Sequence, residues 1–276
     1  MAGDASAIGQ EFLENPLCRK ISFTGSTAVG QTLIRGAAHG VKPLSLELGG
    51  QAPCLVLEDA DVDKAVDHVM LAKFRNTGQA CISANRIYVQ RPIYPRFLDA
   101  FVAKTKALRI GAGTEPDVQI GPLIDEAALV KAAQHVEDAL SRGARLLCGG
   151  RRIPGRPGYF FEPTVLADVP AQGLCMCEET FAPVAPIVPF DSEAEAVERA
   201  NATPFGLCAY AFTRDLGRAF RLMEALESGM LAINDSVPTA TQAPFGGVKQ
   251  SGWGRELGSE GLDAYLDTKH VSLGIG

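Results

Sequence analysis

One cysteine of the chain stands in a polar segment that contains a glycine. The segment occupies residues 76–81 and reads NTGQAC, after a helical pattern that ends near Phe74. This composition predicts a loop, whose backbone N–H groups lower the pKa of a thiol, so Cys81 is a candidate nucleophile. The same pattern fits a partly buried, inert thiol. We assign that state to four other cysteines, Cys18, Cys54, Cys148 and Cys208.

A carboxylate precedes two glycines at residues 47–50, which read ELGG. Residues 44–48 have the pattern of a strand, so Glu47 is expected at a strand's C-terminal end, where α/β sheets place their ligands. A carboxylate there could accept a proton from water. The alternative is an ordinary exposed glutamate at the end of a strand, and the motif alone leaves both open.

Three further motifs contain glycine or acidic residues. Residues 23–30 read FTGSTAVG: the backbone N–H groups and hydroxyls at this helix start can bind a pyrophosphate, or Ser26 or Thr27 simply caps the helix. Residues 177–183 read CEETFAP, which fits a rigid loop that presents a carboxylate to ribose hydroxyls, or a solvated acidic turn. Residues 244–252 read PFGGVKQSG, and we interpret them as a buried aromatic anchor between domains.

Together the five motifs resemble the aldehyde dehydrogenase superfamily in order and separation, from near the first residue to the last. The resemblance implies that Cys81 attacks an aldehyde carbon and that its backbone N–H helps to hold the oxyanion. It implies hydride transfer to NAD or NADP, and a water activated by Glu47 that hydrolyses the thioester. The cofactor-binding residues that it implies are Gly25, Ser26, Gly30, Leu48, Glu179 and Phe181.

Within the superfamily the chain looks most like the succinate-semialdehyde dehydrogenases. Arg75 stands six residues before Cys81, where that subfamily carries an arginine for the substrate carboxylate, and Thr239 stands where it usually carries a serine. In the alternative, Arg75 ends a helix and pairs with a surface acid. Three other functions stay open: a dehydrogenase for another semialdehyde such as glutarate semialdehyde, an inactive truncated fragment that acts only in binding or assembly, and a CoA-acylating relative. The last is disfavoured because Glu47 supplies a hydrolytic base.

Two positions depart from the family pattern. Ala182 replaces the glycine usual after Phe181, which could shift the ribose loop. Ser83 stands two residues after the nucleophile, where some relatives carry a second cysteine. A disulfide between these two positions is therefore excluded.

The elements that would position these residues alternate between short β-type runs and helical patterns. The alternation predicts an α/β class, and the resemblance implies an aldehyde dehydrogenase fold: a remnant of a Rossmann-like cofactor domain plus a parallel-sheet α/β catalytic domain. The expected strands are residues 20–24, 44–48, 54–57, 86–90, 186–190, 209–213 and 231–234. The expected helices are residues 25–39 with Gly40 as C-cap, 62–74, 94–108, 126–142, 194–201 and 216–226, and residues 149–158 are expected to form a surface loop.

We expect three parts along the chain. Residues 1–49 are the truncated C-terminal part of a cofactor-binding domain, residues 50–246 the catalytic domain, and residues 247–276 a return segment with an oligomerisation strand. The chain begins almost directly at the strand before the glycine-rich turn, and it has little more than half the usual family length. We therefore expect an absent N-terminal region that carries an oxyanion-binding asparagine, the adenine-side pocket and strands that pair with residues 263–274 in the family's dimers or tetramers.

That expectation has three consequences. The choice between NAD and NADP stays open, because its determinant belongs to the absent region. The chain alone is expected to be poorly active. It is also expected to be poorly soluble, since an unpaired strand edge promotes association.

The composition limits the classes of partner that the chain is expected to bind. The chain has 26 Lys and Arg against 32 Asp and Glu, a net charge of −6, and no basic block, which argues against nucleic acid and anionic membranes as partners. No apolar run approaches the roughly 18–20 residues of a membrane span, and residues 1–12 lack a signal-peptide pattern. Seven cysteines without disulfide or zinc spacing predict a reducing compartment such as the cytoplasm, and no metal site.

Overall fold

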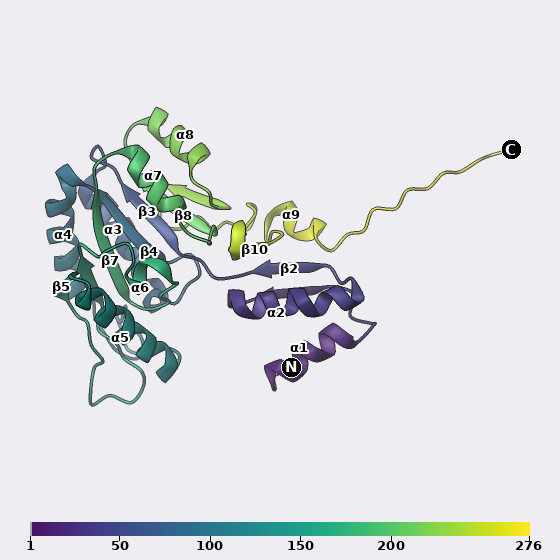
Figure 1. The fold of residues 1–276 in the computed structure, drawn as a ribbon, viewed down its shortest axis with the longest axis horizontal. Helices are drawn as coiled ribbons and strands as arrows, with labels where there is room; N and C mark the ends of the chain where they lie inside the picture. The colour runs from purple at the N-terminus through teal and green to yellow at the C-terminus, as the bar shows by residue number, and fades with distance from the viewer. Residues whose placement is uncertain (1) are drawn as a thin grey trace.

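The computed structural model describes residues 2–276, which form a larger and a smaller lobe (Figure 1). The larger lobe contains a seven-stranded sheet in the order β5-β6-β7-β4-β3-β8-β9, in which only β5 runs antiparallel to its neighbour. Its strands are β3 (Ala52–Val56), β4 (Ala84–Gln90), β5 (Arg145–Cys148), β6 (Thr164–Ala167), β7 (Val184–Phe190), β8 (Cys208–Phe212) and β9 (Met230–Ile233). Its helices are α3 (Val62–Phe74), α4 (Tyr94–Lys106), α5 (Glu126–Ser141), α6 (Leu174–Cys177), α7 (Glu193–Asn201) and α8 (Leu216–Ala225).

Apolar side chains cover both faces of this sheet. Along β3, Cys54 and Val56 face one cluster, which contains Phe101 of α4. Leu55 faces a second cluster, which contains Val136 of α5. Alternation along a strand sends successive side chains to opposite faces, so helices on both sides close the core of the larger lobe.

The smaller lobe contains a three-stranded sheet in the order β1-β2-β10. Its elements are α1 (Ala5–Glu14), β1 (Ile21–Thr24), α2 (Thr27–Ala37), β2 (Leu44–Glu47), β10 (Gly252–Trp253) and α9 (Gly258–Asp263). The return segment thus adds β10, antiparallel to β2. Beyond α9, residues 264–276 form neither helix nor strand; residues 264–267 lie against the smaller lobe, and the chain after them extends away from both lobes (Figure 1). Four short 3-10 turns complete the chain: Ala38–Gly40, Arg75–Gly78, Arg91–Ile93 and Lys249–Ser251.

The structure confirms the predicted α/β class with a largely parallel sheet, and it corrects several details. A helix, α1, precedes β1, although we expected the chain to enter at a strand; none of the residues of α1 is fully buried. Helix α2 ends at Ala37, and the left-handed residue after it is Val41 (φ 50°), not Gly40. Strands β5 and β6 were not predicted; β5 lies at the sheet edge and buries no residue fully.

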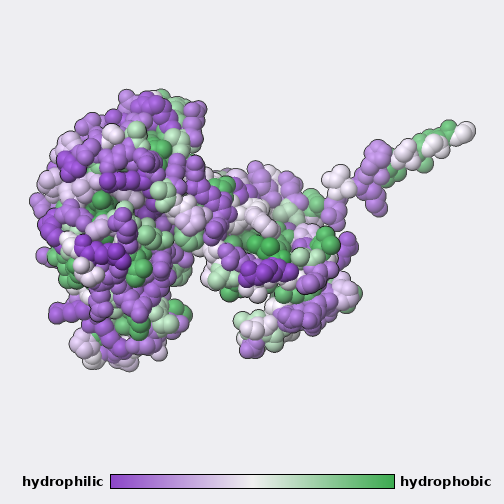
Figure 2. All heavy atoms as spheres, in the orientation of Figure 1, coloured by the Kyte–Doolittle hydropathy of each residue, from purple (hydrophilic) through white to green (hydrophobic). Residues whose placement is uncertain are grey.

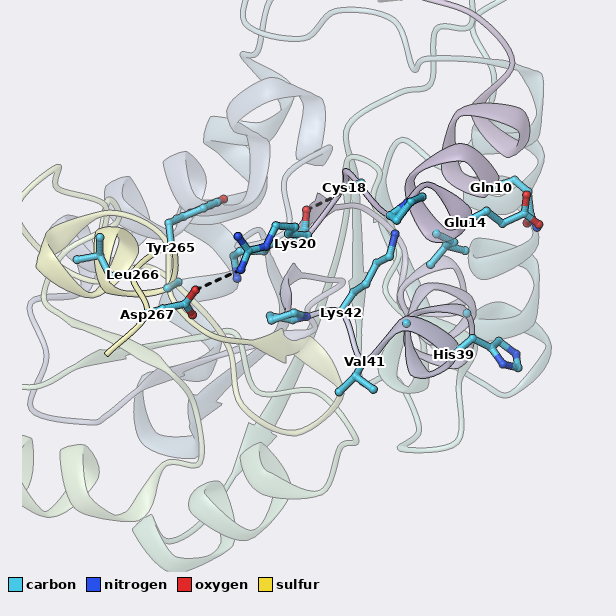
Figure 3. Close-up of a pocket in the computed structure, with 17 residues that line it drawn as sticks. Gln10, Glu14, Cys18, Lys20, His39, Val41, Lys42, Tyr265, Leu266 and Asp267 are labelled. Atoms are coloured by element: carbon cyan, nitrogen blue, oxygen red, sulfur yellow. Dashed lines mark hydrogen bonds and ion pairs between the residues drawn. The ribbon is translucent and has the colours of Figure 1, made fainter. Parts of the chain in front are cut away.

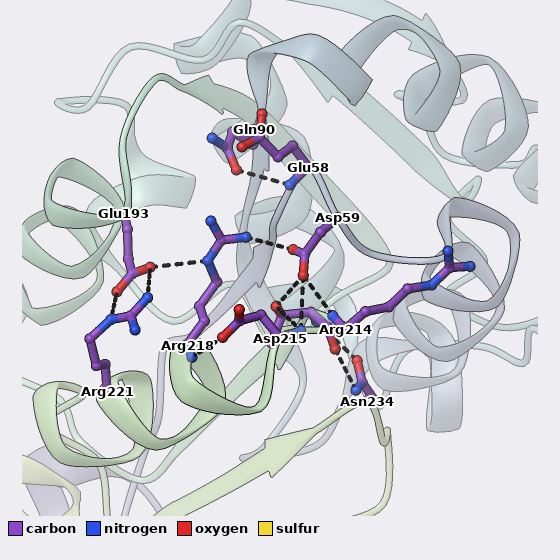
Figure 4. A network of polar contacts seen from close by, with 10 residues as sticks. Glu58, Asp59, Gln90, Glu193, Arg214, Asp215, Arg218, Arg221 and Asn234 are labelled. Carbon is purple, nitrogen blue, oxygen red and sulfur yellow. Dashed lines mark hydrogen bonds and ion pairs between the residues drawn. The ribbon is translucent and has the colours of Figure 1, made fainter.

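A polar network ties together the loops at the C-terminal ends of β3 and β8 (Figure 4). One carboxylate oxygen of Asp59 accepts hydrogen bonds from the Thr213 hydroxyl at 2.7 Å and the Arg214 backbone N–H at 2.8 Å. The other oxygen accepts from Arg218 at 2.6 Å, and Arg218 also donates to Glu193 at 3.1 Å. Burial raises the pKa of Asp59, but these donors outweigh it and the net pKa is lowered. The network therefore stabilises the C-terminal end of the parallel sheet. Cys81, which precedes β4, lies at the other end.

Among residues 2–276, no helix combines the length and the apolar character needed to traverse a bilayer.

Candidate active site

Cys81 follows a tight turn at the end of α3. Asn76 and Thr77 have left-handed backbones (φ 51° and 60°), and Gly78 follows at φ 75°. The Thr77 hydroxyl accepts a hydrogen bond from the Gly121 N–H at 2.9 Å, which holds the turn. Such conformations are costly for residues with a Cβ, and they cluster at functional sites. The turn delivers Cys81 half-buried beside the start of β3.

Glu47 is the last residue of β2 and is buried rather than exposed, contrary to the alternative that its motif left open. Neither carboxylate oxygen has a hydrogen-bond partner among the described residues. Burial, with a contribution from Glu256 that Arg255 partly offsets, raises the pKa of Glu47 to about 8. A Cβ on Gly246 would lie 2.8 Å from Oε1 of Glu47, so the glycine leaves room for the carboxyl group. A buried carboxyl group without a partner is expected to serve chemistry rather than folding.

The two glycines after Glu47 bring the other predicted groups together. The Gly50 N–H donates to Oε1 of Glu179 at 2.9 Å. A Cβ on Gly50 would lie 2.4 Å from the Cys81 carbonyl oxygen, and a Cβ on Gly49 would lie 2.9 Å from Oε2 of Glu179. Only glycine permits these approaches, so residues 47–50 form the point where the loops of Cys81 and Glu179 meet.

The electrostatics of Cys81 differ from our prediction. Burial raises the pKa of the Cys81 thiol, and the carboxylates of Glu179 and Glu47 raise it further. The backbone N–H groups of Cys81 and Ile82 lower it, as the loop composition predicts, but by less. The expected net lowering is therefore wrong, because the loop is packed against two acidic side chains from elsewhere in the sequence. The same interactions indicate that the three side chains lie near one another.

The predicted pyrophosphate turn adjoins this site. Ser26 is the N-cap of α2, with its hydroxyl 3.4 Å from the Val29 N–H. A Cβ on Gly30 would lie 2.6 Å from the Leu48 side chain, so the glycine allows α2 to pack closely on β2. The Gly25 N–H donates to the Glu47 carbonyl oxygen at 3.0 Å. The start of α2 therefore faces the same strand end that carries Glu47.

The loop after Glu179 is constrained at the two positions that we singled out. Phe181 has a left-handed backbone (φ 53°), and its ring is 37% exposed. Ala182 is fully buried, and its carbonyl oxygen would lie 2.4 Å from a Cβ on Gly78. The alanine that departs from the family pattern thus packs directly against the turn before Cys81.

The two residues predicted to bind the substrate, Arg75 and Thr239, are not brought together as clearly as the residues around Glu47. Arg75 is exposed and lines a cavity of about 550 Å³, whose other lining residues are Asp67, Met70, Leu71, Phe74, Lys104, Ala107, Leu108 and Gln119. Within the described chain the Arg75 guanidinium makes neither a hydrogen bond nor an ion pair, so the alternative pairing with a surface acid is absent there. Thr239 is half-buried on the loop after β9, and among residues 2–276 it forms no hydrogen bond with Arg75.

A larger cavity, of about 1340 Å³, lies elsewhere in the smaller lobe (Figure 3). It is bounded by α1, the turn after α2 and residues 264–267, with Lys42 and Tyr265 among its lining. Lys42 donates to the carbonyl oxygens of Phe12 and Asn15 at 2.7 Å, which holds α1 to this turn. Cys81, Glu47 and Glu179 do not line this cavity, so its volume does not indicate the reactive centre.

Several buried polar residues near Cys81 were not predicted from the sequence. Lys73 and Asn85 are almost wholly buried, and they hydrogen-bond to each other at 3.3 Å. Ser83, at the position that departs from some relatives, donates to the Lys73 carbonyl oxygen at 3.2 Å. The sequence feature that could have indicated these buried polar residues is Lys73, a lysine within an apolar helical pattern.

Comparisons with known proteins agree with this geometry. The family model described as the aldehyde dehydrogenase family matches residues 1–271. This chain belongs to the aldehyde dehydrogenase family. The predicted aldehyde dehydrogenase fold is also confirmed, since the structure superposes on the crystal structure of an Escherichia coli NADP-dependent enzyme with a TM-score of 0.98 at 49% identity, over 100% of this chain and 57% of that one.

The relatives that are similar over nearly the whole chain include the following two. The succinate-semialdehyde dehydrogenase [NADP(+)] GabD of Escherichia coli is 49% identical over 100% of this chain and 57% of its own length. The 3-sulfolactaldehyde dehydrogenase of Pseudomonas putida is 52% identical over 99% of this chain and 56% of its own. The lactaldehyde dehydrogenase structure from Escherichia coli superposes with a TM-score of 0.95 at 37% identity, over 99% of this chain and 57% of that chain. The chain spans little more than half the length of these relatives.

Proposed function

We propose that this chain carries the catalytic centre of an NAD(P)-dependent aldehyde dehydrogenase that oxidises an aldehyde bearing a second, acidic group. The observation that supports it most is the convergence of a half-buried thiol, a buried carboxyl group without a partner, and a carboxylate held by a backbone N–H. Cys81, Glu47 and Glu179 meet around residues 47–50. Binding to a nucleic acid or to another protein requires no such arrangement.

The residues present fit a nicotinamide cofactor. Gly49 leaves the side of the Glu179 carboxylate open where a Cβ would fill the space. The start of α2, with Gly25 and Ser26, offers backbone N–H groups for a pyrophosphate. We assign Glu179 to the nicotinamide ribose, Gly25, Ser26, Gly30 and Leu48 to the diphosphate side, and Phe181 to the ring. When bound, the cofactor accepts the hydride that the aldehyde carbon loses.

In the proposed reaction, Cys81 forms the covalent bond to the substrate and Glu47 removes a proton from water. The Cys81 thiolate forms a C–S bond to the aldehyde carbon, and the carbonyl electron pair moves to oxygen, where the Cys81 backbone N–H stabilises it. After oxidation the carbon is held as a thioester. Glu47 then removes a proton from water, the resulting C–O bond displaces the thiolate, and the carboxylic acid leaves. Because the pKa of Glu47 is about 8, the carboxylate that this step needs is populated increasingly up to and beyond that pH.

The acidic group of the substrate is assigned to Arg75 and Thr239. Arg75 is exposed, has no partner within the described residues, lines the cavity of about 550 Å³, and stands six residues before Cys81. A free guanidinium suits a carboxylate or sulfonate. Relatives named for succinate semialdehyde, glutarate semialdehyde and 3-sulfolactaldehyde all act on aldehydes with such a group, and succinate semialdehyde is our first choice.

The test of the reaction uses the product of the complete reading frame that contains this chain. Cys81→Ala is expected to reduce aldehyde-dependent NAD(P) reduction at least 10³-fold. Glu47→Gln is expected to slow turnover about 10²–10⁴-fold while an acyl group accumulates on Cys81, detectable by mass spectrometry. Cys148→Ala, in β5, is the matched control and should leave turnover unchanged. Turnover that survives Cys81→Ala would exclude the proposed mechanism.

The test of the substrate compares an acidic aldehyde with an uncharged aldehyde of equal length. Arg75→Ala is expected to raise KM about 10–100-fold for the acidic aldehyde only, since a hydrogen bond to a charged group contributes about 1.5–3 kcal/mol. Arg96→Ala, which removes an exposed guanidinium paired with Asp63, is the control. Equal effects of Arg75→Ala on both aldehydes would contradict an acidic substrate.

A further inference from the structure

A buried lysine that the proposed reaction does not use lies beneath the candidate site. Lys73 is the second-last residue of α3 and has 0% of its surface exposed. Its Nζ donates to Oδ1 of Asn85 at 3.3 Å. Isolating an ammonium group from water is costly unless neighbouring groups compensate, so the position calls for a reason beyond packing.

Hydrogen bonds lead from Lys73 to the residues of the candidate site. Asn85, which is 1% exposed, donates from Nδ2 to the Gly50 carbonyl oxygen at 3.3 Å. The N–H of Gly50 donates to Glu179, and the Cα of Gly50 abuts the Cys81 carbonyl group. One residue, Gly50, thus lies between the lysine and both functional loops: its carbonyl group accepts from Asn85 and its N–H donates to Glu179.

Charge connects Lys73 to Glu179 as well. Burial lowers the pKa of Lys73 to about 7, and Cys175 and Glu179 oppose that lowering. In turn, burial raises the pKa of Glu179, while the Gly50 N–H, Lys131 and Lys73 lower it. Lys131 also donates to the Glu179 carbonyl oxygen at 2.5 Å. The groups facing the Glu179 carboxylate are therefore two lysines, one backbone N–H and the Cys81 thiol.

We propose that Lys73 is a positioning residue for the cofactor side of the site: through Asn85 it holds the carbonyl group of Gly50, the residue whose N–H binds Glu179, and its charge keeps the Glu179 carboxylate ionised. The proposal deepens the proposed function and rests on the assignment of Glu179 to the cofactor ribose. The hydrogen bond acts at every pH at which the amine donates. Lys73 is charged only at pH values below its own pKa, and there its charge lowers the pKa of Glu179.

Two substitutions separate these contributions. Lys73→Met fills a similar volume and removes both the donor and the charge, whereas Lys73→Gln keeps a donor and removes only the charge. At pH 8.5, where Lys73 is largely uncharged, we expect kcat/KM for the cofactor to be near the parent value in Lys73→Gln and about 5–10-fold lower in Lys73→Met. At pH 6 we expect Lys73→Gln to lie about 5–10-fold below the parent and Lys73→Met lower still, because it lacks the donor as well as the charge. The acid limb of the profile moves to higher pH in both, because Glu179 becomes protonated at higher pH.

The experiment uses the product of the complete reading frame and measures cofactor KM, kcat and melting temperature across pH. Lys106→Met, an exposed lysine of α4, is the matched control and should change none of them. We expect the melting temperature of Lys73→Met to equal or exceed that of the parent, since replacing a buried charge by an apolar side chain is often neutral or stabilising. A lower melting temperature with an unmoved pH profile would show a merely structural role and overturn the proposal.

Glu179→Gln distinguishes a failure of the role proposed for Lys73 from a failure of the assignment of Glu179 to the ribose. An increase in cofactor KM in Glu179→Gln, together with no effect of Lys73→Met, overturns the role of Lys73 and leaves the ribose assignment standing. An unchanged cofactor KM in Glu179→Gln removes the ribose assignment, and the role of Lys73 falls with it. We expect both variants to raise cofactor KM.

Discussion

The two lobes differ in how completely each one buries its own apolar side chains. In the larger lobe helices cover both faces of seven strands, and two extensive clusters are buried. The buried cluster of the smaller lobe consists of only Leu33, Leu46 and Leu48. Apolar side chains remain exposed in the smaller lobe and along the segment after α9, as Figure 2 shows in green, among them Leu17, Val41, Leu266, Val271, Leu273 and Ile275.

The candidate site lies where these unequal lobes meet. The larger lobe supplies Cys81 and Glu179, and the smaller lobe supplies Glu47 and the start of α2. The Ser251 hydroxyl joins them: it donates to the Gly49 carbonyl oxygen at 2.7 Å and accepts from the Gly206 N–H at 2.9 Å. The proposed nucleophile therefore has a rigid support, whereas the proposed general base depends on a lobe with little core of its own.

Matched leucine substitutions should give the largest effect and the clearest contrast between lobes. Leu55 of β3 and Leu46 of β2 are 0% and 1% exposed. Leu55→Ala is expected to lower the free energy of unfolding by about 4 kcal/mol, and Leu46→Ala by about 2 kcal/mol, because a thin core collapses more readily around the cavity. Urea unfolding measures both: Trp253, the only tryptophan, reports the smaller lobe by fluorescence, and far-UV circular dichroism is dominated by the larger.

The parent protein supplies the control for that contrast. Its Trp253 fluorescence should change at a lower urea concentration than its circular dichroism. Coincident transitions, or equal losses for the two leucines, would show that the lobes unfold as one unit and that the contrast has no energetic consequence.

Asp59→Ala should have the next largest effect, on the larger lobe only. It removes the acceptor for Thr213, Arg214 and Arg218, and we expect a loss of about 2–3 kcal/mol in the circular dichroism transition. Asp63→Ala, which breaks an exposed pair with Arg96, should cost less than about 0.5 kcal/mol.

The pH dependence of that effect has a definite sign. Folding lowers the pKa of Asp59 below its ordinary value of 3.8. Its contribution to the free energy of unfolding is therefore complete above pH 3.8, and it is lost as the pH falls through the pKa that Asp59 has in the folded protein. An effect of Asp59→Ala that grew towards acid pH would contradict the network.

Glu47→Gln should produce an effect of opposite sign in the smaller lobe. Folding raises the pKa of Glu47 from 4.5 to about 8, so the folded state resists ionisation of this carboxyl group. The parent protein therefore loses stability as the pH rises from about 4.5 to about 8, and the variant does not. Urea unfolding followed by Trp253 fluorescence at pH 5, 7 and 9 should find the variant increasingly more stable than the parent. Parallel pH dependence of the two proteins would show that the Glu47 carboxyl group is solvated.

The sequence predicted features that depend on local pattern better than features that depend on packing. The strand-to-helix alternation predicted the class of the larger lobe, because β3, β4, β7 and β8 are short and apolar and each is followed by a helix. The pKa of Cys81 was predicted in the wrong direction, since Glu47 and Glu179, distant in sequence, decide it. Lys73 was missed because one lysine in a helical pattern indicates a solvent-facing position, and only the approach of α3 to β4 buries it.

The smallest effect is expected from deleting residues 268–276. These residues form no helix or strand and are exposed throughout, so their removal takes away no buried apolar surface. Tyr265, whose ring lies 5.0 Å from Nζ of Lys20, is retained. We expect the unfolding free energy of either lobe to change by less than about 0.5 kcal/mol, while self-association, measured by light scattering, falls because Val271, Leu273 and Ile275 are gone. A substitution of these three residues by serine in the full chain should reproduce the deletion. A loss of more than about 1 kcal/mol in the fluorescence transition would mean that the tail packs on the smaller lobe and supplies part of the core that this lobe lacks.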